Sequence, residues 1–269
     1  MKGKLYVTAT PIGNLSEMSP RAIETLKSVD FILCEDTTHS KKLLRHFEIS
    51  TPIKSYHKFS EAKSIPDIIN QLNAGRDIAL ITDAGMPTIS DPGARLVSAC
   101  HQNNIQVLVI SGPSAVINAA ALSGMCENGF IFIGFLPEKN KERQKILQLY
   151  AYLPIPMILF SAPHNIQDDL RFLYENLGSR KIAVIKEMTK MFEEIVFINL
   201  EDYQKIEPKG EYVLVMEGSP PENPLLELSI EEHLRYYLDQ GEPKKDAIKK
   251  VASERNLTKN EIYQIAIKL

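Results

Sequence analysis

The chain has no tryptophan and only three cysteines among its 269 residues. Cys34, Cys100 and Cys126 are far apart and odd in number, which excludes a disulfide scaffold and suits reduced thiols in a cytosol. The cysteines lack the spacing of zinc ligands and the histidines form no HExxH pattern, so we expect no metal site. Because no apolar run approaches membrane length and the N-terminus lacks a signal-peptide pattern, we predict a soluble cytoplasmic protein with no membrane partner.

An excess of positive charge is also absent, since the formal net charge is −3. Any affinity for nucleic acid must therefore come from local patches. Basic residues gather in three places: Lys41, Lys42 and Arg45; Lys139, Lys141, Arg143 and Lys145; and the lysines near the C-terminus. Such runs of charge are usually solvent-exposed faces with no binding role. Aromatic residues are sparse and give little support for a base-stacking platform, so recognition of an RNA would rest largely on its shape.

Short apolar runs alternate with amphipathic segments in the first half of the chain, which is typical of an α/β fold with a parallel sheet. The expected strands are Leu5–Thr8, Phe31–Cys34, Ile78–Thr82 and Val107–Ile110. The expected helices are Pro20–Ser28, Lys41–His46, Ile65–Ala74 and Ala94–Asn103, followed by one from Ala115 to about Ser123.

A second block has two final strands with no helix between them, which predicts a mixed sheet. Its strands are expected at Phe130–Gly134, Met157–Ser161, Ile182–Ile185, Ile195–Asn199 and Tyr212–Glu217. A proline-bearing linker at Ser219–Pro224 precedes a small helical appendage with helices at Glu231–Asp239, Lys244–Arg255 and Lys259–Ile267. We therefore predict an α/β domain at residues 1–115, a second at 116–218 and a helical domain at 225–269.

The segment Ile81–Gly93 (ITDAGMPTISDPG) is the most informative loop. Gly85 can adopt positive φ and lacks a Cβ, so a ligand can rest against the main chain, while Pro87 and Pro92 stiffen the loop. Similar loops follow two other strands, at Ala9–Asn14 and Ser111–Ala115. Gly85 alone fits an ordinary connector, whereas the whole cluster of glycines, prolines and aspartates favours a ligand site. Because the carboxyl ends of parallel strands share one edge, the three loops predict one pocket.

The appendage contains a possible helix-turn-helix. Thr258 and Glu261 fit a capping box at the start of the last helix. Two short helices around a tight turn would present lysines to RNA phosphates, and a dimer-stabilising or merely solvated helix pair explains the pattern equally well. The lysines are Lys244, Lys245, Lys249 and Lys250.

Several motifs, in order along nearly the whole chain, resemble the tetrapyrrole methylase superfamily and, within it, enzymes that methylate small-subunit ribosomal RNA. They are TPIGNL at 10–15, CEDTTHSKKLL at 34–44, SYHKF at 55–59, SDPG at 90–93, GPSA at 112–115, GFLP at 134–137, SAPH at 161–164, KEMTKMFEE at 186–194 and KGEYVLVMEG at 209–218. The resemblance implies a homodimeric S-adenosylmethionine-dependent enzyme that methylates the ribose 2′-oxygen of a cytidine in the decoding region of 16S ribosomal RNA in the small ribosomal subunit.

The resemblance also implies site residues. A cofactor cleft between the two α/β domains would be formed by Pro11, Ile12, Gly13, Asp83, Gly85, Met86, Ile89, Ser114, Ala115, Ser161, Ala162, Glu187 and Met188. Core packing remains the alternative for the apolar members, above all for Ile89 and Met188. Candidate RNA contacts are Lys41, Lys42, Arg45, Lys58, Lys139, Lys141, Arg143, His164, Lys244 and Lys245. Thr38 and Asn165 stand where the family usually has arginine, which removes two possible phosphate contacts.

Methyl transfer to a weakly acidic ribose hydroxyl benefits from a base, for which Glu35, Asp36 and His57 are candidates. Asp36 equally fits the cap of the following helix, and His57 fits an RNA hydrogen bond better than proton abstraction. Two other functions stay open. One is a small-molecule methylase acting on a tetrapyrrole, and the other is a non-catalytic ribosome-assembly module with a vestigial cofactor pocket.

Overall fold

A computed structural model describes residues 1–219, 224–255 and 257–267. The chain divides into two compact units, Met1–Gly218 and Ser219–Leu269. Most of the predicted linker Ser219–Pro224 lies outside the described residues. Within the part that is described, no helix is both long and apolar enough to cross a membrane. The first unit contains two five-stranded sheets, and its division near residue 115 into two domains stays a prediction.

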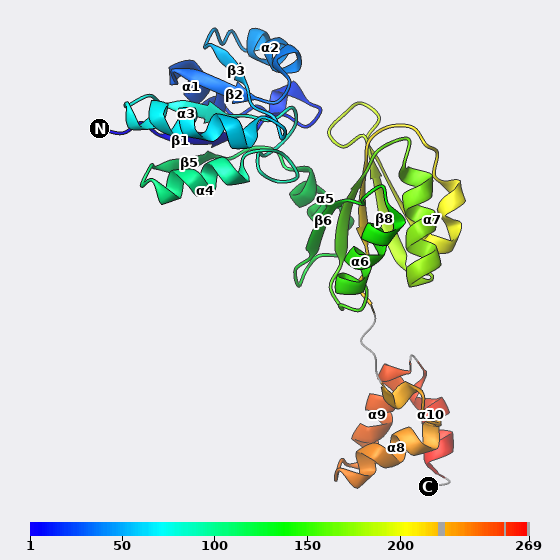
Figure 1. Cartoon of the computed structure of the whole chain (residues 1–269). Coiled ribbons are helices and arrows are strands. Elements are labelled where there is room, and N and C mark those ends of the chain that lie inside the picture. The colour runs from blue at the N-terminus through cyan, green and yellow to red at the C-terminus, as the bar shows by residue number, and fades with distance from the viewer. Residues whose placement is uncertain (220–223, 256, 268–269) are drawn as a thin grey trace. The chain divides into compact units, whose positions relative to one another are not determined.

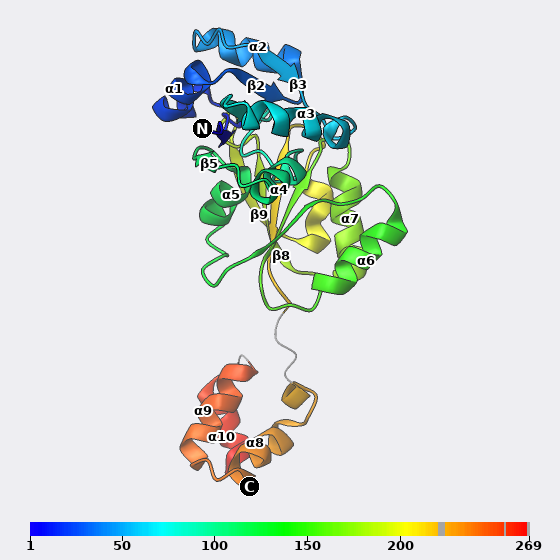
Figure 2. The same ribbon diagram turned by 60° about the vertical axis from the view of Figure 1, so that its left-hand side comes forward.

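The first sheet is fully parallel, with the strand order β3-β2-β4-β1-β5. Its strands are β1 (Leu5–Thr8), β2 (Phe31–Cys34), β3 (Ile53–Ser55), β4 (Ile78–Leu80) and β5 (Val107–Ile110). The helices between them are α1 (Pro20–Ser28), α2 (Thr37–His46), α3 (Glu61–Asn73) and α4 (Ala94–Gln102). Helices α3 and α4 run side by side along this sheet (Figures 1 and 2).

Alternation along the strands gives this sheet two buried faces. Phe31 and Leu33 of β2 pack with Leu72 of α3 and the buried side of α4. Ile32 and Cys34 face the other way, toward the buried side chains of α1 and α2. Because the helices cover the two faces of the sheet, the loops that follow the strands lie at its carboxyl edge and are available to a site.

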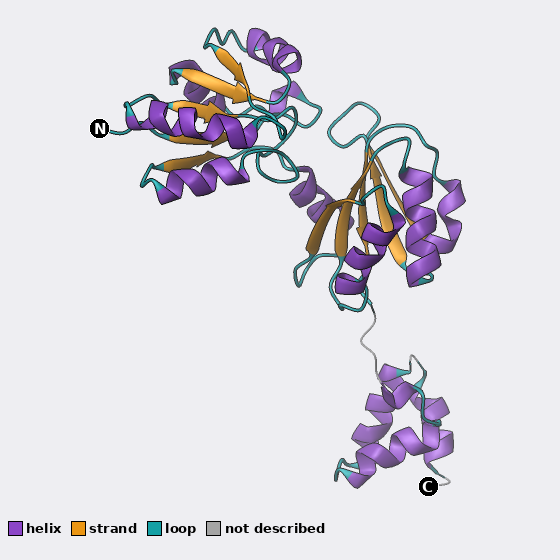
Figure 3. Ribbon diagram, in the orientation of Figure 1, coloured by secondary structure: helices purple, strands orange, loops and turns teal. Residues whose placement is uncertain are grey.

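The second sheet is mixed, as expected, with the order β6-β7-β10-β8-β9. Its strands are β6 (Ile131–Phe135), β7 (Met157–Ser161), β8 (Lys181–Lys186), β9 (Glu194–Asn199) and β10 (Tyr212–Met216). Strand β10 is antiparallel to both β7 and β8, so its first residues lie beside their last ones. The strands lie between α5 (Ala115–Ser123) on one face and α6 (Asn140–Tyr150) with α7 (Ile166–Leu177) on the other (Figure 3).

The largest differences from the sequence prediction concern five elements. Strand β3 and helices α6 and α7 were not expected, while α2 and α3 begin four residues earlier than expected, at Thr37 and Glu61. The expected start of α3 at Ile65 placed Pro66 in the first turn, where proline is tolerated. The helix extends further because Glu61 is buried and accepts hydrogen bonds from Tyr56 Oη (2.9 Å) and Gly93 N (3.0 Å).

The second unit packs α8 (Ile230–Asp239), α9 (Lys244–Glu254) and α10 (Lys259–Ala266) around an apolar core of its own (Figure 2). The predicted capping box forms, since Glu261 N donates to Thr258 Oγ1 and Thr258 N donates to Glu261 Oε2. His233 is fully buried within this core and contacts Glu254 through Nε2 at 2.8 Å. Helices α9 and α10 therefore lie where the sequence pattern predicts them, on either side of a short turn.

Candidate functional site

A cavity of about 500 Å³ lies in the first unit and is lined by both sheets. From the first sheet it receives the segments that follow β1, β2, β4 and β5, and from the second the ends of β6, β7 and β8 and the start of β10. The loop after β4, residues 82–91, supplies the largest share of the lining. The predicted convergence of strand-end loops therefore produces one cavity.

The loop after β4 is held to the loop after β1 by main-chain hydrogen bonds. Thr10 N donates to Gly85 O (2.9 Å) and Gly85 N donates to Thr10 O (3.1 Å), while Thr10 Oγ1 donates to Thr82 O (3.0 Å). Gly85 has φ +81°, and a Cβ there would lie 3.2 Å from Ile12 Cγ2. Glycine is thus needed for both the conformation and the space beside the cavity.

The far end of this loop is fixed by Gly93, which begins α4. Gly93 has φ +130°, and a Cβ would lie 2.6 Å from Leu80 Cδ2, so a side chain there would press on the side chain of Leu80. Its N–H donates to the buried carboxylate of Glu61, as described above. Thr88 and Ser90 also have positive φ, at +75° and +69°. Such strain in non-glycine residues is typical of ligand-binding loops.

The second sheet supplies the opposite wall. Ser161 at the end of β7 pairs with Tyr212 of β10, and Lys186 at the end of β8 pairs with the same tyrosine. This antiparallel register brings Ser161, Ile185 and Tyr212 to one edge, where all three line the cavity. The rings of Phe135 and Phe160 contact each other at a centroid distance of 5.3 Å and complete an apolar part of the wall.

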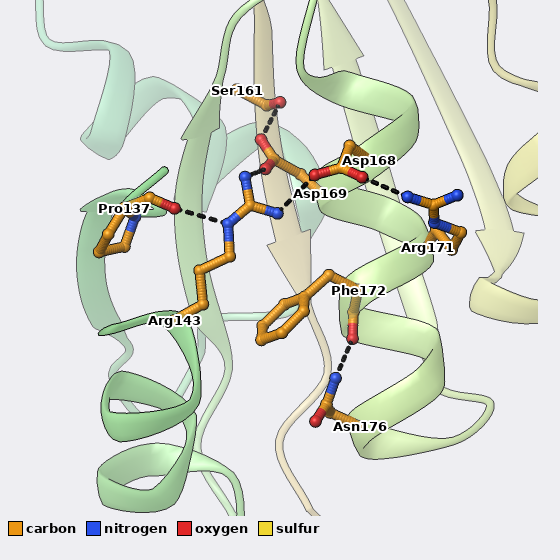
Figure 4. A network of polar contacts seen from close by, with 8 residues as sticks. All are labelled: Pro137, Arg143, Ser161, Asp168, Asp169, Arg171, Phe172 and Asn176. Carbon is orange, nitrogen blue, oxygen red and sulfur yellow. Dashed lines mark hydrogen bonds and ion pairs between the residues drawn. The ribbon is translucent and has the colours of Figure 1, made fainter. Parts of the chain in front are cut away.

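Behind Ser161 lies a buried polar network, drawn in Figure 4. Ser161 Oγ donates to Asp169 Oδ2 at 2.6 Å, and Asp169 Oδ1 forms an ion pair with Arg143 Nη2 at 3.1 Å. Arg143 also donates to Asp168 Oδ2 (2.8 Å) and to Pro137 O (2.5 Å). Burial raises the pKa of Asp169, and the Ser161 hydroxyl and Arg143 oppose that rise.

Loops from the two sheets meet beside the cavity at Gly13. A Cβ on Gly13 would lie 2.6 Å from Lys190 Cγ and 3.1 Å from Met188 O, so only glycine allows this approach. Glu187, at φ +49°, accepts hydrogen bonds from Glu211 N (2.8 Å) and Lys190 Nζ (3.2 Å). These bonds lower the pKa of Glu187, chiefly through the main-chain donor.

Four acidic residues line the cavity: Glu35, Asp83, Asp91 and Glu211, and the last of these is paired with Lys190. Burial, with repulsion from Glu35 and Asp83, raises the pKa of Asp91 to about 6, although Thr82 donates a hydrogen bond that opposes the shift. Asp83 Oδ1 is buried without a hydrogen-bond partner among the described residues. The cavity thus combines apolar surface with acceptors for a cationic or hydroxyl-bearing ligand.

Most of the predicted cofactor residues come together in this cavity. Those in its lining are Ile12, Asp83, Gly85, Met86, Ile89, Ser114, Ala115, Ser161, Ala162 and Met188. Pro11, Gly13 and Glu187 lie outside the described lining, next to residues that belong to it. The contacts of any of these residues with a ligand remain predictions.

The three candidate bases occupy different environments. Glu35 lines the cavity. Asp36 is exposed and caps α2, where it accepts hydrogen bonds from Thr38 N (2.6 Å) and His39 N (3.2 Å) that lower its pKa. His57 lies in the turn after β3, with Nδ1 buried and lacking a hydrogen-bond partner within the described part of the chain. Of the three, the structure brings Glu35 to the cavity.

The prediction that Arg143 contacts RNA is wrong, because its side chain is only 3% exposed and is fully engaged in the network behind Ser161. The remaining candidate RNA contacts are exposed: Lys41, Lys42, Arg45, Lys58, Lys139, Lys141, His164, Lys244 and Lys245. Lys139 is close to Glu142 at 3.8 Å. Exposure permits RNA contact at these positions, and contact itself stays a prediction.

Sequence reasoning missed several lining residues. Asp91, Phe135 and Tyr212 line the cavity without having been singled out. Each stands inside a quoted motif, SDPG, GFLP or KGEYVLVMEG, so the motifs themselves were the available signal. Phe160 directly precedes the predicted Ser161 and lacked a signal of its own.

Comparisons with known proteins agree with this geometry. A family model described as Tetrapyrrole (Corrin/Porphyrin) Methylases matches residues 4–204. The chain is similar to the Ribosomal RNA small subunit methyltransferase I of Synechocystis sp., with 41% identity over 99% of this chain and 98% of that protein. The similarity extends through the helical unit as well as both sheets.

Solved structures agree in fold. A diphthine synthase covers 80% of this chain and 89% of its own, with a TM-score of 0.66 and 14% identity. The uroporphyrin-III C-methyl transferase of Thermus thermophilus, solved in complex with S-adenyl homocysteine, covers 80% of this chain and 97% of its own, with a TM-score of 0.55 and 17% identity. At these identities the likeness concerns the arrangement of the two sheets.

Proposed function

This chain belongs to the ribosomal RNA small subunit methyltransferase I family of tetrapyrrole methylases, and on that premise we propose that it methylates the ribose 2′-oxygen of a cytidine in the decoding region of 16S ribosomal RNA. It is an S-adenosylmethionine-dependent methyltransferase. The observation that carries the proposal is the cavity, in which strand-end loops of both sheets converge around Gly85.

The residues of the cavity fit S-adenosylmethionine. Gly85 leaves space for a ligand against the main chain, and Asp83 Oδ1 offers an acceptor that no described residue uses. Glu35, Asp83 and Asp91 give the cavity a negative potential that favours a sulfonium cation. We assign Ile12, Met86 and Met188 to apolar contact with the cofactor.

When bound, S-adenosylmethionine would supply an electrophilic methyl group for in-line displacement by the ribose oxygen, with S-adenosylhomocysteine as the leaving group. The protein's task is to orient the hydroxyl and exclude water. Phe135, Phe160 and Ile89 provide apolar walls against which a bound substrate would exclude water. Glu35 is our candidate for the group that accepts the hydroxyl proton, because it lines the cavity while Asp36 caps a helix.

The test is incubation of the protein with radiolabelled S-adenosylmethionine and small ribosomal subunits that lack modification, followed by mapping of the label. We expect label on one ribose 2′-oxygen in the decoding region, and none with a Gly85→Val variant. Label on a base nitrogen, or on a porphyrinoid acceptor and not on RNA, would refute the proposal. Cofactor binding without transfer to any acceptor would instead favour an assembly module.

The proposal includes a homodimer that acts in the cytoplasm. Helix α5 is apolar except for Asn118 and Ser123, and its residues Ile117 and Leu122 are 57% and 42% exposed. A helix of this composition normally lies between two packed surfaces. The second sheet covers one side of α5, and a second copy of the chain would cover the other.

A further inference from the structure

The turn after β3, residues His57–Ser60, holds an aromatic side chain in solvent. Ser60 N and Glu61 N donate to His57 O at 2.9 and 3.0 Å, and His57 N donates to Ser60 Oγ at 3.2 Å. Phe59 stands at the tip of this hydrogen-bonded turn and is 95% exposed. An ordered turn that exposes a whole phenyl ring loses the benefit of burying it unless another molecule covers the ring.

This turn is tied to the edge of the cavity from two sides. Glu61, the residue after the turn, binds Gly93 N and thereby the loop that contains Asp91. Strand pairing sets Ser55 of β3 beside Cys34 of β2, and the next residue, Glu35, lines the cavity. Phe59 therefore lies on the same strand-end edge as the cavity.

The surface around Phe59 is basic. Lys58 precedes it in the turn and Lys63 follows in the first turn of α3, and both are exposed. Arg95, whose side chain is 73% exposed, lies 3.9 Å from the buried carboxylate of Glu61, the second residue after Phe59. A positive surface with one exposed ring suits an anionic polymer of aromatic units better than a second copy of this net-acidic chain.

We propose that Lys58, Phe59 and Lys63, here called the β3 rim, bind a single-stranded segment of the RNA substrate next to the methylated nucleotide. Phe59 stacks on a nucleobase, and the two lysines contact the flanking phosphates. This inference rests on the proposed function, since it assigns part of the same substrate to a surface beside the same cavity.

The first experiment measures methylation of unmodified small subunits by variants of the full chain. We expect Phe59→Ala and Phe59→Leu each to raise KM for the subunits about tenfold, as loss of one stacked base would, while Phe59→Trp stays near wild type. A Lys58→Ala/Lys63→Ala variant should also raise KM and weaken its dependence on salt. Affinity for S-adenosylhomocysteine should be unchanged throughout, because the β3 rim lies outside the cavity lining.

Matched controls come from the opposite ends of the strands. Tyr152, 74% exposed, lies between α6 and the start of β7, and Lys27 lies in the last turn of α1 before β2. Alanine at either position should leave KM unchanged. An equal rise in the controls would mean a general loss of surface contacts and would overturn the proposal.

A second experiment reads the stacking directly. Because the chain has no tryptophan, the Phe59→Trp variant carries a single tryptophan at the β3 rim, and Tyr152→Trp carries one at the far end; each is excited at a wavelength that tyrosine does not absorb. A cytidine-containing single-stranded oligonucleotide of about ten nucleotides, at a concentration that filter binding shows to be saturating, should quench the first emitter and not the second. Unchanged emission from the first would overturn stacking.

Other outcomes separate the causes of failure. Full rescue by leucine, or a change of molecular mass on Phe59→Ala in light scattering, would mean that a protein surface covers the ring, and would overturn the β3 rim as an RNA site. If the wild-type chain methylates the subunits and Phe59→Ala does so with the same KM, the inference fails alone. If the wild-type chain transfers no methyl group to RNA, both the proposed function and the inference about the β3 rim are refuted.

Discussion

Ser161 Oγ, at the wall of the cavity, donates a 2.6 Å hydrogen bond to the buried carboxylate of Asp169, which in turn pairs with Arg143. This chain of contacts connects the end of β7 to helices α7 and α6 (Figure 4). Its charged members are 4% and 3% exposed, so water cannot replace a lost partner. The position of the Ser161 hydroxyl therefore depends on an ion pair that does not itself line the cavity.

Replacement of Asp169 by alanine should cost about 3–5 kcal/mol of unfolding free energy, because it leaves the buried Arg143 without one of its two carboxylate partners. Urea denaturation gives this value. The matched control is Asp168→Ala, since Asp168 also pairs with Arg143 but its side chain is 49% exposed, and we expect a loss of about 1 kcal/mol or less. Equal losses at the two positions would contradict a buried role for Asp169.

Replacement of Gly85 by alanine should weaken binding of S-adenosylhomocysteine by more than about tenfold, or about 1.4 kcal/mol. The new Cβ would press on Ile12 at the cavity wall. Gly124→Ala is the control, because Gly124 also has positive φ, at +65°, but a Cβ there meets no atom within 4 Å. Calorimetry on both variants separates the backbone strain of a positive φ, which both share, from the contact with Ile12, which only Gly85→Ala makes. Unchanged affinity in Gly85→Ala would mean that the cofactor binds at another site.

Much of this fold could be predicted because short apolar β-branched runs and strand-end loops are local signals. The first sheet's strands β1, β2 and β5 have the bounds expected from sequence. Two of the differences, the missed helix α6 and the early start of α3, share a cause in charged residues at buried positions. Helix α6 contains the buried Arg143 and few apolar residues, and α3 begins with the buried Glu61. Their partners stand about 25 to 32 residues away in sequence, at Asp168 and Gly93, so no local pattern reveals them.

The site could also be predicted in part. The loops at Gly85 and Ser114 could be placed at one sheet edge because the alternation of strands and helices along the chain predicts parallel strands. The antiparallel return of β10, which brings Tyr212 to the cavity beside Ser161, is a long-range pairing that the sequence does not encode locally. Arg143 shows the converse, since a basic residue in a charged run was assigned to the surface and lies in the core.

Removal of the Asp91 carboxyl should change how stability depends on pH. The native pKa near 6 lies above the ordinary value of 3.8, so between these values the folded chain binds the proton more tightly than the unfolded chain. The unfolding free energy of the wild type, relative to Asp91→Asn, should therefore fall as pH rises from about 4 to about 6 and stay low above that. At pH 7–8 the variant should be more stable, by at most about 2 kcal/mol since Asp91 is only half-buried.

Urea denaturation of both proteins at several pH values from 4 to 8 tests this. The comparison cancels contributions from other groups, such as Asp36 and Glu187, whose pKa values are lowered. A difference between the two proteins that does not vary with pH would mean that Asp91 has the same pKa in the folded and unfolded chains, so that burial and the repulsion from Glu35 and Asp83 do not raise it.

Replacement of Glu61 by alanine should reduce both stability and cofactor affinity, although Glu61 does not line the cavity. The variant removes the acceptor shared by Tyr56 Oη and Gly93 N and leaves both donors buried, which costs about 2–3 kcal/mol. Because Gly93 anchors the loop that contains Asp91, affinity for S-adenosylhomocysteine should fall as well. Glu61→Gln keeps an acceptor oxygen at the same place and should recover most of both losses. Thermal unfolding and calorimetry on the pair check this, and failure of glutamine to recover them would mean that the negative charge near Arg95 is what matters.

Introduction of a charge on the outer face of α5 should separate the proposed dimer. Ile117→Glu places a carboxylate where a second copy would pack, and light scattering should report the mass of a dimer for the wild type and of a monomer for the variant. Leu149→Glu is the control, because Leu149 is 68% exposed on α6, at the opposite face of the second sheet, and should leave the mass unchanged. A wild-type monomer would exclude the dimer outright. A dimer that survives Ile117→Glu would place its interface away from α5 and leave the apolar face of that helix to another partner.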